Sequence, residues 1–443
     1  MKTRQLLFFG FFILLQINMM GQLKITAELR ARGELFNSYK YLADTTNETQ
    51  YYVTQRTRLN FDYKKDFYEL YISLQDVRAW GGEDMSSGTI VLGSSHGLDI
   101  YEASAKFNLS SKLSLKIGRQ EYDFDDRRIL CNRNWNQYGL SYDGLLLSYK
   151  TKRLLFMAQS GINSMQTKII GDVTNKNNEY YDGSKGRMKT FNFIYLRKDF
   201  NDEFYVTGAA YLAGYQKVGS TSTVYGTGTY GLHLSYKNDF LEAKGNIFMQ
   251  SGKNYEGKKI TGAMMATAMA QYNGKKIIAG LGLDHYSGHN SSKSDFVYNN
   301  EIHTFNLMYG ARFPFNGNMN MYMLMDKHTK NGGLDDLYGK IGYKFNKKHN
   351  LTATYHLFST AEYVFKGLNG TTKEYYEKNL GSEIDLMYKY IINKEINIMA
   401  GGCYYFTTEA TEAVKGVGAG TSGKPFYSYL MVTFKPNLYN QKD

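Results

Sequence analysis

One short stretch of the sequence concentrates side chains that could do chemistry. Residues 118–137, GRQEYDFDDRRILCNRNWNQ, hold four Arg, three Asp and one Glu within twenty positions, together with Cys131 and Trp135. Such a cluster could bind a metal ion, form part of a hydrolytic site, or line the throat of a membrane pore. Which of these applies depends on the elements that position the stretch.

The metal interpretation is the weakest of the three. Asp123, Asp125 and Asp126 offer oxygen ligands, but the adjacent Arg127 and Arg128 compete for the same carboxylates. The spacing also lacks the central Gly and the terminal Glu of a helix-loop-helix calcium loop. The eight His residues of the chain show no zinc-ligand spacing. We therefore expect no bound metal and no cofactor.

The first residues have the layout of a secretory signal peptide. Lys2 and Arg4 form a basic start, and an apolar run from Leu6 to Ile17 follows it. This run is shorter than the roughly 20 residues that a membrane-spanning helix needs. Small residues at Gly21-Gln22 offer a cleavage point. The sequence thus predicts an exported protein whose mature chain, residues 22–443, forms a single domain.

The composition favours β-strands. There are 40 Tyr, 26 Phe and 44 Gly but only 3 Pro and 2 Cys. Aromatic residues suit a pleated surface, and few prolines permit long uninterrupted ladders. Two cysteines cannot build a disulfide scaffold. Cys131 and Cys403 are expected to be unpaired thiols, although export would permit a disulfide between them.

Apolar and polar residues alternate along the chain. In KITAELRARGE (24–34), Ile25, Ala27 and Leu29 take one face, while Glu28 and Arg30 take the other. Short polar turns, such as 63–67 and 198–202, alternate with long Gly/Ser/Asn/Thr-rich loops, such as 79–98, 123–139 and 161–186. Strands of about ten residues joined in this way are typical of an outer-membrane β-barrel. A soluble β-protein is disfavoured because the polar faces are too charged for a dry core.

The number of strands is open on periodicity alone. A count that includes residues 302–312 and 318–326 gives twenty strands, and a count without them gives eighteen. Both numbers are even, and both place the two termini on the periplasmic side, where the short turns lie. In either case the sequence predicts an all-β, transmembrane antiparallel barrel with long extracellular loops.

The stretch from 118 to 149 resembles the alginate export porin family of outer-membrane barrels. The resemblance is strongest at GRQE (118–121), DRR (126–128) and NRNW (132–135). Further fragments agree in order, at 55–61, 283–288, 331–344, 380–390 and 427–436. The resemblance implies an eighteen-stranded monomer in which 301–330 is an extracellular loop. It also implies a pore lined by basic residues that favour an anionic polyuronate.

Two positions depart from the family pattern. Cys131 stands where members usually have a small, unreactive residue, and the chain continues past the aromatic Phe434. The fold therefore transfers more securely than the substrate does. Export and uptake stay open, and so does whether loop 123–139 or 301–330 folds into the lumen.

The candidate pore residues are charged and lie either at inward positions or in the loop. Rings of Arg and Lys attract anions, and nearby acids position them and limit how tightly a polyanion binds. Parity would point Arg119 outwards, so either a β-bulge near Gly118 resets the register or the strand has already left the hydrocarbon at Arg119. The full set is Arg30, Arg32, Arg56, Arg58, Lys106, Lys116, Arg119, Glu121, Asp123, Asp126, Arg127, Arg128, Arg133, Glu383 and Asp385.

The sequence therefore predicts an outer-membrane porin of a Gram-negative bacterium that passes anionic solutes by passive diffusion. The expected partners are membrane lipid, an anionic polysaccharide or small organic anions, and the barrel-assembly machinery, with no nucleic acid. Each arginine taken singly could equally be an ion-paired wall residue without a role in selectivity. The alternative functions are a non-conducting surface barrel and, less favoured, an outer-membrane hydrolase; no arrangement of nucleophile and base is legible in the sequence.

Overall fold

A computed structural model describes residues 21–81, 98–162, 188–218, 220, 223–307 and 309–441. The expected signal peptide lies outside the described residues, except for Gly21 at its predicted end. The predicted long loops 79–98 and 161–186 also lie largely outside them.

Most of the described chain forms antiparallel strands. In chain order the barrel strands are β1 (Gln22–Phe36), β2 (Gln50–Lys65), β3 (Tyr68–Ala79), β4 (Asp99–Asn108), β5 (Leu113–Gln120), β6 (Tyr142–Lys150), β7 (Leu154–Ile162), β8 (Met188–Asp199), β9 (Phe204–Gln216), β10 (Val224–Lys237), β11 (Leu241–Lys253), β12 (Lys259–Asn273), β13 (Ile277–Tyr286), β14 (Leu334–Lys344), β15 (His349–Ser359), β18 (Asn379–Ile391), β19 (Ile396–Phe406) and β20 (Phe426–Phe434).

These strands close into a barrel. Each pairs with the next along the chain, and β1 pairs with β20 from Leu29↔Phe434 to Phe36↔Tyr427. The sheet has nineteen strands in all, and one of them, β21 (Asn437–Asn440), only continues the line of β20. The described residues therefore form an eighteen-stranded barrel, which confirms the lower of the two predicted counts. The described residues of 302–312 and 318–326 form no strands of this sheet.

The seam between the first and last strands is made in two parts. Beyond the β20 ladder, the backbone N–H of Ala27 donates to the carbonyl of Pro436 at 3.1 Å. Below that point, β21 pairs with β1 through Lys24↔Asn440 and Ile25↔Tyr439. The residues after Phe434 thus cover the part of β1 that β20 does not reach.

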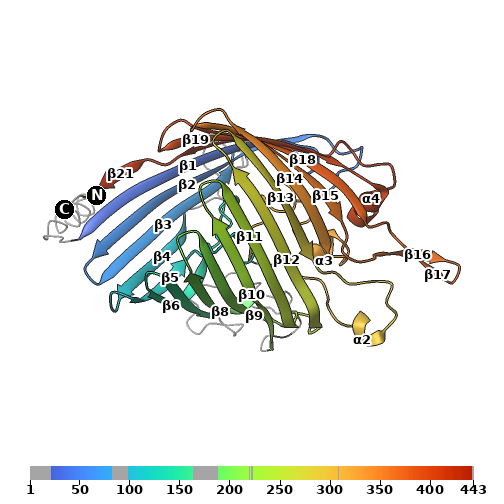
Figure 1. Ribbon diagram of the computed structural model, residues 1–443, viewed down its shortest axis with the longest axis horizontal. Coiled ribbons are helices and arrows are strands. Elements are labelled where there is room, and N and C mark those ends of the chain that lie inside the picture. The colour runs from blue at the N-terminus through green and yellow to red at the C-terminus, as the bar shows by residue number, and fades with distance from the viewer. Residues whose placement is uncertain are drawn as a thin grey trace, which may run out of the picture.

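Short turns and long loops lie at opposite ends of the barrel. Both termini are at one end, and the small extra elements project at the other (Figure 1). These elements are α2 (Phe296–Asn299), α4 (Glu409–Lys415) and the hairpin of β16 (Phe365–Asn369) and β17 (Thr372–Tyr375). A further short helix, α3, spans Met325–His328. None of the helices in the described part of the chain is long and apolar enough to cross a membrane.

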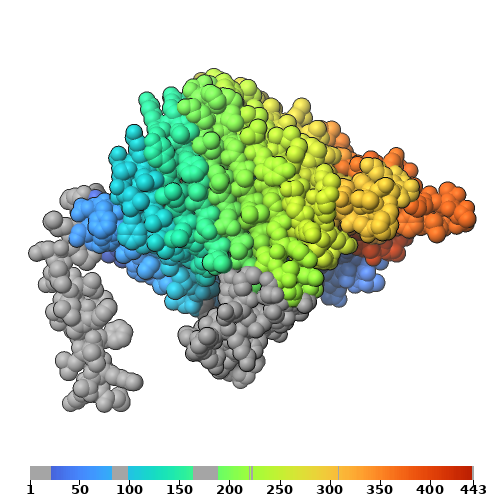
Figure 2. All heavy atoms as spheres, turned by 90° about the horizontal axis from the view of Figure 1, so that it is seen from below, coloured from blue at the N-terminus to red at the C-terminus, as the bar shows by residue number. Residues whose placement is uncertain are grey.

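The two faces of each strand differ in chemistry. Outward positions carry bare apolar side chains, such as Leu281, 69 % exposed, and Ile341, 67 % exposed. Inward positions on the same strands carry Asp284 and Asp336, which are 1 % and 0 % exposed. Neighbouring strands follow one another in chain order across the outer surface in Figure 2. An apolar outer face and a polar inner face on a closed sheet are what a lipid bilayer requires.

Candidate functional site

Two long loops fold into the lumen. Inner loop 1 (residues 121–141) connects β5 to β6, and inner loop 2 (residues 301–332) belongs to the connection between β13 and β14. Their backbones touch directly, because the N–H of Ala311 donates to the carbonyl of Arg127 at 2.7 Å. The rings of Trp135 and Phe313 stack with centroids 3.6 Å apart. The structure thus answers a question that the sequence left open, since both loops enter the barrel.

Inner loop 1 crosses the barrel from one wall to the other. On the far wall, Tyr195 of β8 and Thr207 of β9 each donate a hydrogen bond of 2.9 Å to Asp125. Asn246 of β11 donates to Asp126 at 2.7 Å. Its other end is held by arginines of β1 and β2, so the loop divides the lumen.

The four predicted arginines of β1 and β2 point inward and are almost fully buried. Arg30 donates to the carbonyls of Asn134 at 2.6 Å and Asn136 at 2.8 Å. Arg32 donates to the carbonyl of Trp135 at 2.9 Å and lies over the ring of that residue. N–H donors of both guanidinium groups are therefore bound to backbone carbonyls of inner loop 1.

The other two arginines of this row stabilise the wall and the loop. Arg56 lies opposite Arg30 in the ladder, and such a like-charged pair would repel without compensation. Glu28 compensates it by accepting from Arg56 Nε at 3.0 Å, and the carbonyl of Gln137 accepts from Nη1 at 3.3 Å. Arg58 donates to Gln75 of β3 at 2.7 Å and lies 3.5 Å from the Tyr101 ring centroid.

Arg128 is the central ion-pair residue of the site. Its side chain is 4 % exposed, and Nη1 lies 2.7 Å from Asp284 of β13, while Nε lies 3.3 Å from Asp126 of its own loop. Nη1 also donates to the hydroxyl of Tyr286 at 3.0 Å, and the guanidinium lies 4.0 Å from the centroid of Phe315. One buried cation therefore joins inner loop 1, β13 and inner loop 2.

The remaining charged residues of inner loop 1 have separate partners. Glu121 accepts from the hydroxyl of Tyr101 at 2.9 Å. Asp123 pairs with the exposed Arg127 at 2.7 Å. Arg133 donates to the carbonyl of Gly310 at 2.9 Å, which adds a second contact to inner loop 2. The three aspartates that had been weighed as calcium ligands thus each contact a different group.

The position of Arg119 differs from the sequence prediction that it lines the pore. The ladders of β5 with β4 and β6 run without a register shift, so no bulge at Gly118 turns the side chain inward. Gln120 is 0 % exposed in the lumen, and Arg119 points outward, where it pairs with Asp143 of β6 at 2.9 Å. Arg119 therefore does not line the lumen. Its place near the long-loop end of β5 limits the cost of an outward charge, which falls towards the membrane interface.

A second group of charges lies on β14, β15 and β18, and β18 is separated from β1 only by β19 and β20. Glu383 and Asp385 of β18 are buried, and they accept from the backbone N–H groups of Met319 at 2.8 Å and Asn318 at 3.1 Å. His356 of β15 lies 2.9 Å from Asp336 of β14 and 3.6 Å from Asp385. The two predicted acids thus contact inner loop 2 rather than the arginine row.

The sequence prediction missed several residues of this wall. Asp284, Asp336 and His356 sit at inward positions of β13, β14 and β15, so strand parity could have identified them. The contacts of Asn318 and Met319 had no such signal, because they join segments more than sixty residues apart.

Both cysteines are unpaired, as the sequence predicted, and both are buried. Burial raises the pKa of the Cys131 thiol in inner loop 1 to about 11. Since a thiol is nucleophilic as the thiolate, Cys131 is unreactive at neutral pH while the loop is docked.

Several cavities lie beside the inner loops in the described part of the chain. One of about 410 Å³ lies beneath inner loop 1 and is bordered by Glu28, Arg58, Glu102 and Lys435. One of about 220 Å³ lies between the loops and β13–β15. A third of about 440 Å³ lies towards the long-loop end. The described residues that line these cavities include charges of both signs.

A closed eighteen-stranded barrel with an apolar belt and loops folded into a polar lumen defines the class of outer-membrane porin-like barrels. The family model described as alginate export matches residues 21–422. The chain therefore belongs to the alginate export family. This confirms the resemblance seen in the sequence.

Solved structures support the fold. The chain is similar to Pseudomonas aeruginosa OpdL at 11 % identity, with 94 % of this chain and 99 % of that chain covered and a TM-score of 0.58. It is similar to Acinetobacter baumannii OccAB1 at 11 % identity, with 95 % and 97 % covered and a TM-score of 0.57. For Pseudomonas aeruginosa OprD the values are 11 %, 94 %, 96 % and 0.55. No curated protein sequence matches the chain.

Proposed function

We propose that the protein is a passive outer-membrane channel for anionic solutes, with a carboxylate-bearing saccharide of the polyuronate type as the favoured class. The observation that carries the proposal is an excess of cations in the half of the lumen nearest the short turns. The acids at inward positions there are Glu28, Asp62, Glu69, Asp199 and Glu242, and Glu28 pairs with Lys435 at 2.9 Å. The bases there are Lys24, Lys64, Lys106, Lys116, Arg197, Lys237, Lys244, Lys340, Lys344, Lys389 and Lys435.

Some of these lysines are available to a passing anion. Lys106 is paired with Glu69 at 2.7 Å, and Lys244 with Glu242 at 2.6 Å. Lys116 of β5 and Lys340 of β14 have no ion pair within 4.0 Å among the described residues. Lys340 also lines the 220 Å³ cavity. Unpaired ammonium groups in a confined lumen raise the local concentration of anions.

The arginine row has a different part in this proposal. Because Arg30, Arg32 and Arg56 hold backbone carbonyls of inner loop 1, they fix the shape of the passage rather than offer open anion sites. Selectivity then rests on the lysines below the loops. The solute, its direction of passage, a monomeric state and the barrel-assembly partner remain parts of the proposal that rest on the family.

Planar-bilayer recordings test the proposal. We expect the purified protein to conduct and to pass Cl⁻ in preference to K⁺. The double variant Lys116→Gln/Lys340→Gln should lower the Cl⁻/K⁺ permeability ratio. A matched control, Lys373→Gln in the exposed β16–β17 hairpin, should leave the ratio unchanged. A K⁺ preference, or an unchanged ratio in the double variant, contradicts the proposal.

The same recordings separate the alternative functions. A protein without measurable conductance would support the non-conducting surface barrel, in which the inner loops act as a plug. A hydrolase would additionally need turnover of a substrate, and this remains the less favoured alternative.

A further inference from the structure

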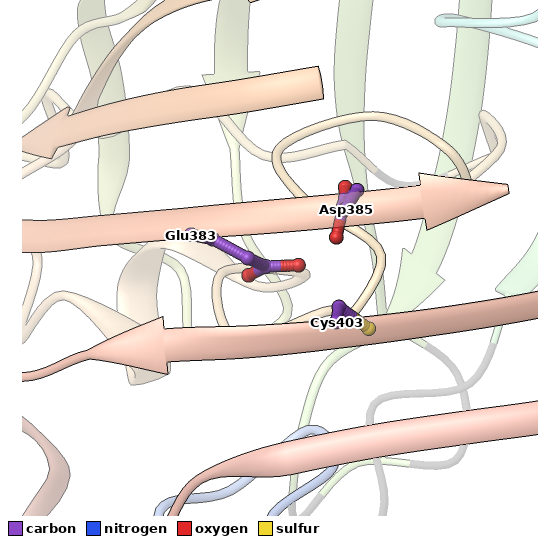
Figure 3. Close-up of side chains that lie close together, drawn as sticks. All are labelled: Glu383, Asp385 and Cys403. Carbon is purple, nitrogen blue, oxygen red and sulfur yellow. The ribbon is translucent and has the colours of Figure 1, made fainter. Parts of the chain in front are cut away.

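Two carboxylates on β18 are only half satisfied. Glu383 and Asp385 are 0 % and 4 % exposed, and they face the lumen close to Cys403 of β19 (Figure 3). One oxygen of each accepts from the backbone of inner loop 2, as described above. The other oxygens, Glu383 Oε2 and Asp385 Oδ1, are buried without a hydrogen-bond partner. Burying an anionic oxygen without a partner is costly, so something must compensate these two atoms.

Inner loop 2 adds neutral oxygens at the same place. Asn318 is 4 % exposed, and its Oδ1 is also buried without a partner. Asn316 shares both properties. Both residues line the 220 Å³ cavity together with Asp385. Amide oxygens and carboxylate oxygens that lack donors around one cavity point to a missing positive partner.

The loop backbone lies directly over Glu383. A Cβ placed on Gly317 would lie 2.5 Å from Glu383 Oε2, so a side chain at this position would collide with the carboxylate. Gly317 also has a positive φ of 79°, which favours glycine. A side chain at this position therefore cannot supply a donor to Oε2. Glu383 does not itself line the cavity, but its carboxylate lies within 4.8 Å of that of Asp385, which does.

The protein's own cations do not balance the charge. His356 lies between Asp336 and Asp385, so a single imidazole faces two carboxylates. Arg128, which also borders the cavity, is paired with Asp284 and Asp126. Two neighbouring buried carboxylates must share a proton or bind a cation.

The donor set favours a hard divalent cation. Ca²⁺ takes carboxylate and Asn side-chain oxygens and completes its shell with water, for which the cavity has room. Cys403 Sγ lies with the two carboxylates within 4.8 Å, which would suit a softer metal. However, its thiol donates to the carbonyl of Tyr427 at 3.3 Å and is therefore not a thiolate ligand.

We propose that a calcium-class divalent cation binds Glu383 Oε2, Asp385 Oδ1 and Asn318 Oδ1, and thereby fixes inner loop 2 to the wall of the barrel. This site borders the same 220 Å³ cavity that Lys340 lines. Its occupation would keep residues 316–320 docked on β18, where the backbone contacts already place them.

Calcium titration of the purified, EDTA-treated full chain in detergent tests the site. We expect one saturable Ca²⁺ site per chain, with a dissociation constant of about 10⁻⁴–10⁻³ M, the range of extracellular calcium modules. Ca²⁺ should also raise the melting temperature relative to EDTA. Glu383→Gln should abolish saturable binding, and Asn318→Ala should weaken it about tenfold or more, as the loss of a supporting group commonly does.

Two further variants keep the test decisive. Glu377→Gln, at an exposed carboxylate in the loop before β18, should bind Ca²⁺ like the wild type and thus accounts for surface binding. Asn318→Ala retains both carboxylates, so it still tests Ca²⁺ binding at this site if Glu383→Gln fails to fold. Absence of saturable binding in the wild type, which the shared-proton state predicts, overturns the proposal. Equal Ca²⁺ affinity in Asn318→Ala and the wild type overturns it as well.

Discussion

Removal of the Arg128 side chain is expected to release the inner loops. Arg128 is the buried cation between Asp126 and Asp284, and its loss leaves Asp284 in the lumen wall without its 2.7 Å partner. Breaking a buried pair by removing one member costs about 3–5 kcal/mol. Since 1.4 kcal/mol corresponds to a factor of ten, Arg128→Ala should shift the docking equilibrium of the loops by about two to three and a half orders of magnitude.

The adjacent arginine provides a matched control. The Arg127 side chain is 58 % exposed and pairs with Asp123 of the same loop. An exposed pair of this kind contributes about 0–1 kcal/mol. Arg127→Ala should therefore leave both stability and conductance close to those of the wild type.

Single-channel recording and urea unfolding measure the two effects. Arg128→Ala should show larger or noisier conductance and a lower unfolding midpoint. The paired variant Arg128→Met/Asp284→Leu should recover most of the lost stability, because it leaves no uncompensated charge. If Arg128→Ala and Arg127→Ala behave alike in both assays, the assignment of Arg128 as the residue that locks the loops is refuted.

Two further perturbations test the inner loops. A Cβ at Gly310 would lie 1.8 Å from the carbonyl oxygen of Arg128, whereas one at Gly367 meets nothing within 4 Å, so Gly310→Ala should lower the urea midpoint and Gly367→Ala should not. In inner loop 2, burial and then the charges of Lys415, Arg312 and Lys327 lower the pKa of His328 to about 4. Because the unfolded chain binds the proton more readily between pH 6.5 and 4, stability should fall on acidification through this window. The fall in melting temperature from pH 7 to pH 5 should be larger in the wild type than in His328→Gln, and equal falls would contradict this assignment.

The barrel was predictable because its signal is local and repeated. Alternation placed Arg30, Arg32, Arg56 and Arg58 on one face of β1 and β2, and the structure confirms that they point inward. The same parity argued that Arg119 points outward. A bulge near Gly118 and a position beyond the hydrocarbon were both open; the ladders contain no bulge, so placing Arg119 among the lumen residues was wrong. Inward and outward alternation along a strand should be set aside only where a β-bulge is visible in the ladder.

The loops were not predictable in the same way. Inner loop 2 has strand-like alternation at 302–312 and 318–326 that predicted strands wrongly, and its contacts depend on distant partners, such as Met319 with Glu383. The role of the arginine row was likewise only partly predictable. The sequence showed that Arg30 faces the lumen, but only the fold shows that loop carbonyls occupy its donors. The sequence thus predicted which charged side chains point into the lumen, but it did not predict which of them a solute could reach.

The two-part seam bears on how the barrel is made. Since β20 covers β1 only from Leu29 onward, the rest of β1 finds its ladder partners in β21 and Pro436. Without those residues, N–H and C=O groups of Lys24 and Ile25 would form an open sheet edge, which is costly next to lipid and ready to pair with another chain. Closure of the barrel is therefore complete only when the segment after the aromatic Phe434 has paired with β1. Pro436 and β21, which follow the last full barrel strand, thus complete the hydrogen bonding between the two ends of the sheet.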